Sequence, residues 1–130
     1  MNYIGSMTNS SPIIAQLAAE DISGNFLAAE LTADGVKKAS AGAAAIGIIL
    51  PEQGDTKAGE RVDIQIKDIC RWMSGGEVAA GDLLSSDADG KCVKASNGEF
   101  IIGIALETAN AADIPILVQL TKSGYCTASK

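Results

Sequence analysis

The chain has 130 residues, the length of one ordinary domain, which at this size buries roughly two thirds of its unfolded surface. Hydrophobic residues make up 47% of the chain but aromatic residues only 4%, so we expect a thin core of small aliphatic side chains, with room for a partner subunit to complete it. The net charge of −6, with scattered Lys and Arg, argues against a nucleic-acid-binding surface, because such a surface needs a basic stripe.

The cysteine and hydropathy patterns argue against a disulfide-bonded, zinc-binding, membrane-spanning or secreted protein. Cys70, Cys92 and Cys126 are odd in number and widely spaced, and the chain contains no histidine, so they form neither a disulfide framework nor a zinc site. We expect free thiols in the reducing cytoplasm of the cell that makes the protein. The longest apolar stretch, residues 41–50, is too short to cross a bilayer, and the amino end lacks the pattern of a secretory signal. We expect no metal, no cofactor and no membrane contact.

The amino-terminal segment is polar and shows no periodicity, so we interpret residues 1–20 as a flexible arm. Tyr3, Ile4 and Met7 are apolar side chains within it, and they are candidates for contacts with a partner. The last part of the arm, residues 12–20, allows two interpretations. It is either a short helix that begins at a proline or an extended segment, and we favour the extended segment.

From residue 21 onward, short apolar segments alternate with turn signals that arrive about every ten residues. This spacing, with no long helical pattern, predicts an all-β fold, an antiparallel β-barrel or sandwich with little helix. We expect one β domain over residues 21–120 and a polar tail over residues 121–130. The expected strands cover residues 26–31, 36–39, 43–50, 62–67, 70–73, 78–84, 92–95, 100–106 and 114–120.

One pattern occurs twice. Residues 38–50 and 94–106 both read Lys-Ala-Ser, then a glycine, then Ile-Gly-Ile, and they are identical at eight of thirteen positions. With the neighbouring turns, this predicts an internal repeat over about residues 24–66 and 81–120, so the domain consists of two similar half-units. We expect the isoleucines beside the repeated glycine to be core residues. They are Ile46, Ile48, Ile102 and Ile104.

We find no catalytic residue and no metal-ligand set in the sequence. Histidine, the most common general base, is absent. Asp34, Asp55, Asp87 and Asp89 lie beside or near glycines, where carboxylates accept hydrogen bonds within turns. The lone tryptophan, Trp72, could be a ligand platform, a core residue or an interface residue, and we favour an interface. The sequence therefore predicts a protein that is not an enzyme.

Several motifs of the second copy point together to one family. The segment Ile-Gly-Ile-Ala-Leu-Glu at residues 102–107 is followed by Ala-Ala-Asp-Ile and Val-Gln-Leu, and residues 79–91 precede it. In the first copy, residues 46–48 and 58–64 carry a similar series. Over residues 21–120 the chain resembles the small bacteriophage capsid cement, or head decoration, proteins.

The resemblance implies a structural, non-enzymatic β protein of the virion that binds the outside of the phage head and clamps neighbouring capsid subunits against internal DNA pressure. It implies the major capsid protein as partner, and self-association in which a trimer is favoured over a dimer. The arm would add backbone hydrogen bonds at a partner's sheet edge.

A different class stays open at this point: a cytoplasmic β-barrel carrier or small-ligand-binding module. Lys37, Lys38 and Lys94 lie near turns, where a carrier would hold its modified lysine, but none has the flanking pattern expected of one.

Overall fold

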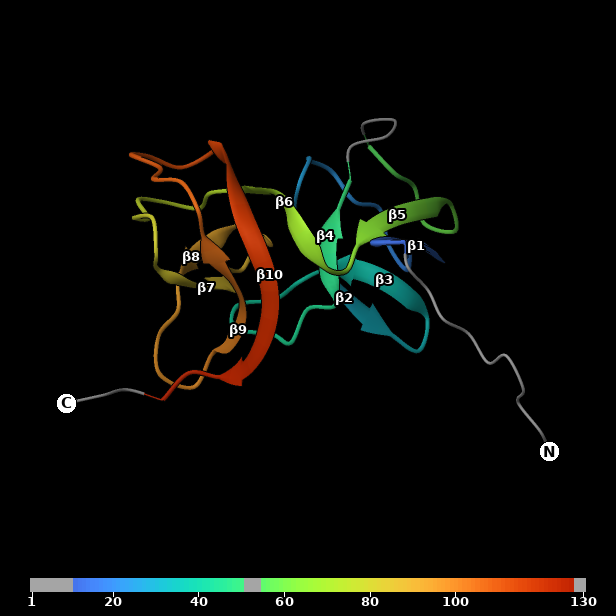
Figure 1. Ribbon diagram of the computed structural model, residues 1–130. Helices are drawn as coiled ribbons and strands as arrows, with labels where there is room; N and C mark the ends of the chain where they lie inside the picture. The colour runs from blue at the N-terminus through green and yellow to red at the C-terminus, as the bar shows by residue number, and fades with distance from the viewer. Residues whose placement is uncertain (1–10, 51–54, 128–130) are drawn as a thin grey trace.

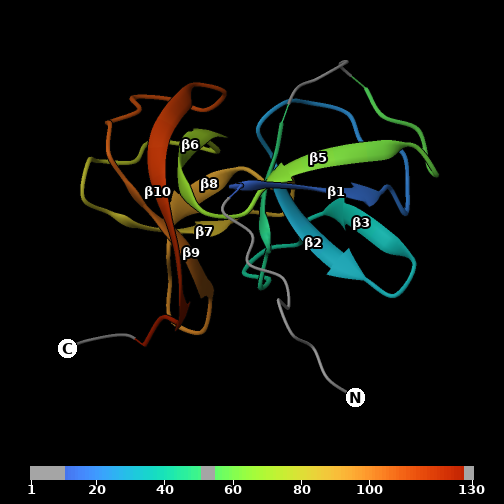
Figure 2. The same cartoon turned by 45° about the vertical axis from the view of Figure 1, so that its right-hand side comes forward.

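The computed structural model describes residues 11–50 and 55–127 (Figure 1). These residues form ten β-strands and no helix, arranged as two sheets that lie side by side (Figures 1 and 2). The predicted all-β fold is confirmed. The strands are β1 (Ile13–Leu17), β2 (Ala28–Thr32), β3 (Gly35–Lys38), β4 (Gly47–Ile49), β5 (Arg61–Gln65), β6 (Asp68–Met73), β7 (Leu83–Ser86), β8 (Cys92–Lys94), β9 (Phe100–Ala105) and β10 (Pro115–Tyr125).

The two sheets have the same topology. The first has the order β1-β5-β4-β2-β3 and the second the order β6-β10-β9-β7-β8, so adding five to each strand number converts one into the other. Every ladder in both sheets is antiparallel. The expected two similar half-units are confirmed, and we call β1–β5 the first half and β6–β10 the second half. Each half has five strands, so it begins one strand earlier than the repeat at residues 24–66 and 81–120 that the sequence indicated.

Each sheet also curls until its outer strands meet. In the first half a short parallel bridge joins Ala18, just after β1, to Val36 of β3, and in the second half an equivalent bridge joins Ser74 to Cys92 of β8. Each half is therefore a small five-stranded barrel closed by one bridge. Closure of this kind covers strand edges that would otherwise invite pairing with another chain.

The repeated glycine has a steric role at the same place in both halves. A Cβ built on Gly103 would lie 2.5 Å from the carbonyl oxygen of Gln119, and one built on Gly47 would overlap the carbonyl oxygen of Gln65. In each half the glutamine belongs to the adjacent strand of the sheet. Because only a residue without a side chain fits here, the close approach of these strands depends on the Ile-Gly-Ile motif.

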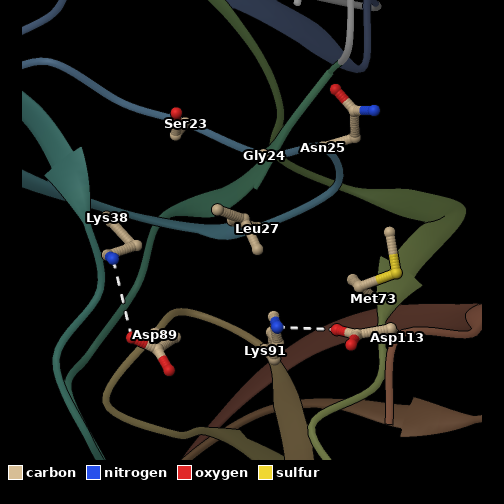
Figure 3. A pocket seen from close by; sticks show the side chains of 9 residues that line it. All are labelled: Ser23, Gly24, Asn25, Leu27, Lys38, Met73, Asp89, Lys91 and Asp113. Carbon is tan, nitrogen blue, oxygen red and sulfur yellow. Dashed lines mark hydrogen bonds and ion pairs between the residues drawn. The ribbon is translucent and has the colours of Figure 1, made fainter. Parts of the chain in front are cut away.

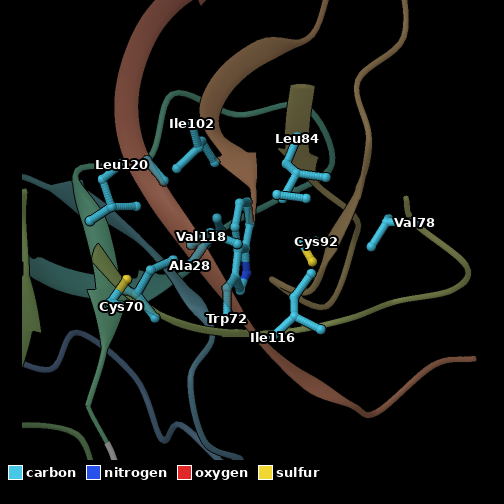
Figure 4. Packing of buried hydrophobic residues seen from close by; sticks show 14 of the residues in the cluster. Ala28, Cys70, Trp72, Val78, Leu84, Cys92, Ile102, Ile116, Val118 and Leu120 are labelled. Atoms are coloured by element: carbon cyan, nitrogen blue, oxygen red, sulfur yellow. The ribbon is translucent and has the colours of Figure 1, made fainter. Parts of the chain in front are cut away.

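Two hydrophobic cores fill the halves. The first core is Ala18, Ile22, Ala29, Val36, Ile49, Val62 and Ile64, with Ile14, Ile46 and Ile66 partly buried against it. The second core is Cys70, Trp72, Val78, Leu84, Cys92, Ile102, Ala105, Ala109, Ile116, Val118 and Leu120, together with Ala28, Ala39, Ala45 and Ile48 of the first half (Figure 4). The first half therefore supplies part of the core of the second half.

The expected core isoleucines divide into two kinds. Ile48 and Ile102 are wholly buried, whereas Ile46 and Ile104 are only half-buried. Ile46 and Ile102 pack in the core of their own half, while Ile48 contributes to the core of the other half. Ile104, in the position equivalent to Ile48, has no half-unit packed over it, which explains its exposure.

Backbone and side-chain hydrogen bonds fasten the two halves together. The carbonyl oxygen of Gly90 accepts the backbone N–H of Ala28 at 2.7 Å and the Trp72 Nε1–H at 2.8 Å. The Lys122 ammonium donates to the carbonyl oxygens of Ile46 and Ile66 at 3.2 and 2.6 Å. Burial lowers the pKa of the Lys122 ammonium. These contacts join the second half to the first at two separate places.

Both ends of the predicted domain need correction. β1 lies within the stretch that we expected to be a flexible arm, residues 1–20, and it pairs along its whole length with β5, so the extended interpretation of its last part is the right one. At the other end, β10 continues to Tyr125, although residues 121–130 were expected to be a tail. Most side chains of this segment are polar, so the sequence did not indicate a strand, although after a bulge the segment pairs again with β9 and the Tyr125 ring contacts the Phe100 ring edge-to-face.

Candidate functional site

The arm residues proposed as contacts, Tyr3, Ile4 and Met7, lie outside the described residues. The structure does place the root of the arm. The carbonyl oxygen of Pro12 accepts a hydrogen bond from the backbone N–H of Ile66 at 2.7 Å, so the chain enters the body beside the end of β5. Contacts made by the arm would therefore start from the first half.

The expectation that Trp72 lies in an interface is wrong. Its side chain is 0% exposed and lies in the middle of the second core, with its indole N–H bonded to Gly90 (Figure 4). From Ile69 to Trp72 exposed and buried residues of β6 alternate, so Cys70 and Trp72 point into the barrel while Ile69 and Arg71 face outward. Trp72 therefore cannot contact a partner while the body stays folded.

A groove of about 450 Å³ lies where the two halves meet (Figure 3). Its lining comes from the loop before β2, from β3, and from loops and strand ends of the second half. The lining residues are Ser23, Gly24, Asn25, Leu27, Lys38, Met73, Asp89, Lys91 and Asp113.

Both lysines of this groove are paired with carboxylates. Lys38 lies 3.6 Å from Asp89, and Lys91 donates to Asp113 at 2.6 Å, as the dashed lines in Figure 3 indicate. The hydrogen bond to Asp113 raises the pKa of Lys91 above its ordinary value. Each cation is thus partly neutralised by an aspartate of the second half, which makes the groove a polar seam rather than an anion-binding site.

Among the turn aspartates that were expected to accept hydrogen bonds, Asp87 does so in the structure. Asp87 Oδ1 accepts the backbone N–H groups of Asp89 and Lys91 at 2.8 and 2.9 Å, which holds the turn between β7 and β8. Within residues 11–50 and 55–127 we find no group of three or more side chains able to hold a metal ion, and no helix that could cross a membrane.

The three cysteines are free thiols, as expected. Cys70 and Cys92 are buried in the second core, and burial raises the pKa of each thiol to about 12. A thiol with such a pKa stays protonated at neutral pH, so neither side chain is a nucleophile there. Cys126 is partly exposed just after β10.

An exposed row of side chains on the second sheet was not predicted from the sequence. Leu83, Ile104, Gln119 and Ile69 lie opposite one another across β7, β9, β10 and β6, so their side chains form a row on one face of the second sheet. Leu83 is 42% exposed and Ile69 is 54% exposed. In the part of the chain that the structure describes, the exposed large apolar side chains are Ile13, Leu17, Leu31, Ile69, Leu83, Leu106, Ile114 and Tyr125.

The pattern of this row could have been found in the sequence only with the register of the sheet, because each of its residues belongs to a different strand. Leu83 and Ile104 are neighbours in this row, and the polar Gln119 separates them from Ile69. Exposed apolar side chains gathered on one face of a sheet are a feature of surfaces that contact other proteins. The row and the root of the arm are thus the two parts of the described molecule that are best placed to meet a partner.

Comparison with known proteins gives one family match and one structural likeness. The model of the phage cement protein family matches residues 23–120. Among solved structures, the chain is similar to the head fiber gp8.5 N base in bacteriophage phi29, with a TM-score of 0.66 and 16% sequence identity over 86% of this chain and 97% of that chain. At this identity the likeness shows the fold alone. No match was found among curated proteins. Because the family match spans both halves of the body, the chain belongs to the phage cement protein family.

Proposed function

We propose that this protein binds the outer surface of a phage head and holds neighbouring capsid subunits together. The observation that carries the proposal is the family match over residues 23–120, which includes strands of both half-barrels. As a phage cement protein, the chain is a structural component of the virion capsid. The major capsid protein is the proposed partner.

The folded body suits this role. Each half is a closed barrel, and the two are joined by hydrogen bonds and a shared core, so the body can transmit load between two points of attachment. Many copies on one shell would add their separate contacts, so each contact could be modest in strength. The arm, which enters the body beside the end of β5, offers one such contact.

We propose further that the protein is a homotrimer and that its halves arose by internal duplication. The identical strand orders and the repeated Ile-Gly-Ile motif support duplication. Exposed apolar side chains on a small body support self-association, since covering them with a second copy removes apolar surface from water.

The direct test of shell binding is co-sedimentation with purified capsid shells that lack the protein. Expanded shells should bind the wild-type protein saturably, at a fixed number of copies per capsid subunit. Shells coated beforehand with unlabelled protein are the control and should bind almost none. Failure of bare expanded shells to retain the protein at micromolar concentrations would contradict the proposed function.

The arm has its own test. Deletion of residues 1–10 removes Tyr3, Ile4 and Met7 and keeps every described residue of both cores, so the melting temperature should stay nearly unchanged. Binding to expanded shells should weaken at least tenfold, about 1.4 kcal/mol per arm. A deletion of residues 128–130 is the matched control and should bind like the wild type. If the chain without residues 1–10 binds as tightly as the full chain, the arm is not a contact.

A further inference from the structure

The same surface occurs once in each half, covered in one and uncovered in the other. In the first half the carbonyl oxygen of Ala28 on β2 accepts the backbone N–H of Ala39 at 2.9 Å, and Ala28 lies opposite Ile48 of β4. In the second half the carbonyl oxygen of Leu83 on β7 accepts the backbone N–H of Ala95 at 2.8 Å, and Leu83 lies opposite Ile104 of β9. We call these sets the first face and the second face. The first face is Ala28, Ala39 and Ile48, and the second face is Leu83, Ala95 and Ile104.

Exposure separates the two faces. All three residues of the first face are 0% exposed, because they pack into the second core. On the second face Leu83 is 42% exposed, and Ala95 and Ile104 are half-buried. The first face is therefore apolar and fully buried, whereas the equivalent second face is partly exposed and has Leu83 in place of Ala28.

The surface that the first face covers also recurs. Three residues of the second half, on β6, β9 and β10, are buried in the same cluster as the first face, and we call this set the second rim. The equivalent residues of the first half form the first rim. The second rim is Cys70, Ile102 and Leu120, and the first rim is Ile14, Ile46 and Ile66. The equivalence follows from the ladders, since Ile14 lies opposite Ile64 just as Cys70 lies opposite Val118.

The two rims also differ in exposure, and here the rim of the first half is the more exposed one. The second rim is at most 8% exposed, whereas all three isoleucines of the first rim are half-buried. Lys122 reaches the carbonyl oxygens of Ile46 and Ile66, but these bonds are made to the backbone and leave the apolar side chains partly exposed. In one chain the first face and the second rim are therefore buried together, whereas the second face and the first rim both stay partly exposed.

We infer that the second face of one copy packs on the first rim of the next copy, and so repeats between chains the joint that already holds the two halves together. Such a contact is heterologous, because it brings two different surfaces together, and it gives a ring if the rotation closes. The inference rests on the proposed homotrimer, in which three copies would place six half-barrels in one closed ring. A second copy is the occupant that the structure favours, since a half-barrel of this same fold already covers the equivalent rim.

Substitution of the second face tests this inference in the full chain. Leu83→Asp places a charge on an exposed side chain and should leave the fold intact, as circular dichroism would check. By sedimentation velocity at about 10 µM, the wild type should be a trimer and the variant a monomer, with a dissociation constant raised at least 100-fold. Leu31→Asp is the matched control, because Leu31 is 46% exposed but belongs to neither face nor rim, and it should remain trimeric. A monomeric wild type, or a Leu83→Asp variant that stays trimeric, would overturn the inference.

Mixing two variants tests the head-to-tail geometry. Leu83→Asp keeps an intact first rim, and Ile66→Asp keeps an intact second face, so each alone should be monomeric. Their mixture should form a one-to-one dimer and nothing larger, which native mass spectrometry resolves once one variant carries a heavy isotope. Ile14→Asn provides a second rim variant if Ile66→Asp does not fold. A mixture that stays monomeric would contradict the contact between face and rim.

Shell binding separates the inference from the proposed function. If wild-type protein fails to bind bare shells but Leu83→Asp still abolishes the trimer, the proposed function fails and the ring stands. If the wild type binds shells and Leu83→Asp leaves the trimer unchanged, the ring fails and the proposed function stands.

Discussion

The two halves of the molecule share one set of strand pairings but are filled very differently. The first core, as far as the structure describes it, contains only alanine, isoleucine and valine. The second core contains Trp72, Leu84 and two cysteines, and it borrows four residues from the first half. The pairing pattern of this fold is therefore set by turns and by the glycine of the Ile-Gly-Ile motif, and it tolerates wide variation in the side chains that fill the barrel.

This comparison also predicts an uneven distribution of stability. The second half has its rim covered by the first half, whereas the first half leaves its own rim half exposed. Side chains of the second core should therefore contribute more to the free energy of unfolding than their equivalents in the first core. The predictions that follow measure that difference.

The largest effect is expected at Trp72. Trp72→Ala should lower the free energy of unfolding by about 3–5 kcal/mol, because it removes a fully buried ring and leaves a cavity in the second core. It also removes the indole hydrogen bond to Gly90 at the joint between the halves. Urea unfolding followed by circular dichroism measures the loss. An unchanged midpoint would mean that the second core does not depend on this side chain.

The next prediction compares equivalent residues directly. Ile102→Ala should cost about 2–4 kcal/mol, and Ile46→Ala about half as much, because Ile102 is fully buried and Ile46 is only partly buried. Both should be measured by urea unfolding in the Leu83→Asp background, so that association between chains does not contribute. Equal losses at the two positions would show that the first rim is already covered within a single chain.

Alkaline pH should weaken the second half through its two buried thiols, Cys70 and Cys92. The folded state keeps the Cys70 and Cys92 thiols protonated up to about pH 12, whereas in the unfolded chain they ionise near 9.0. Between these values the unfolded state binds fewer protons, so stability falls as pH rises, by about 1 kcal/mol per thiol at pH 10.

The check is a series of urea unfolding curves from pH 7.5 to 10.5 for the wild type and for a variant with Cys70→Ala and Cys92→Ala. The variant should start less stable, since it loses buried volume, but its stability should decline less with pH. Parallel curves for the two proteins would contradict the assignment of this pH dependence to the buried thiols.

Much of this architecture could be predicted from the sequence, for identifiable reasons. Asn-Gly and Asp-Gly turns and the repeated Ile-Gly-Ile motif indicated short antiparallel strands in two similar units, and both features are present. β1 was harder to recognise because residues 12–20 are rich in alanine, which fits a helix or a strand. The end of β10 was missed because most of its side chains are polar, and it pairs with β9 again only after a bulge.

The candidate site could be predicted only in part. In a strand as short as β6, neighbouring side chains alternate between core and surface, so an isolated tryptophan gives no indication of which side it faces. Leu83 belongs to an apolar run that reads as a core strand, and its exposure follows from the absence of a covering half-barrel. The exposure of Leu83 depends on how the two halves pack together, and the local sequence around Leu83 does not determine that packing.

The central claim, that this protein decorates the outside of a phage head, is tested most directly by electron cryomicroscopy of bare expanded shells incubated with the purified chain. The account predicts additional density at fixed positions on the outer surface, shaped as pairs of small β-barrels that touch more than one capsid subunit. A map that is identical to that of the bare shell, or additional density only on the inner surface, would contradict it.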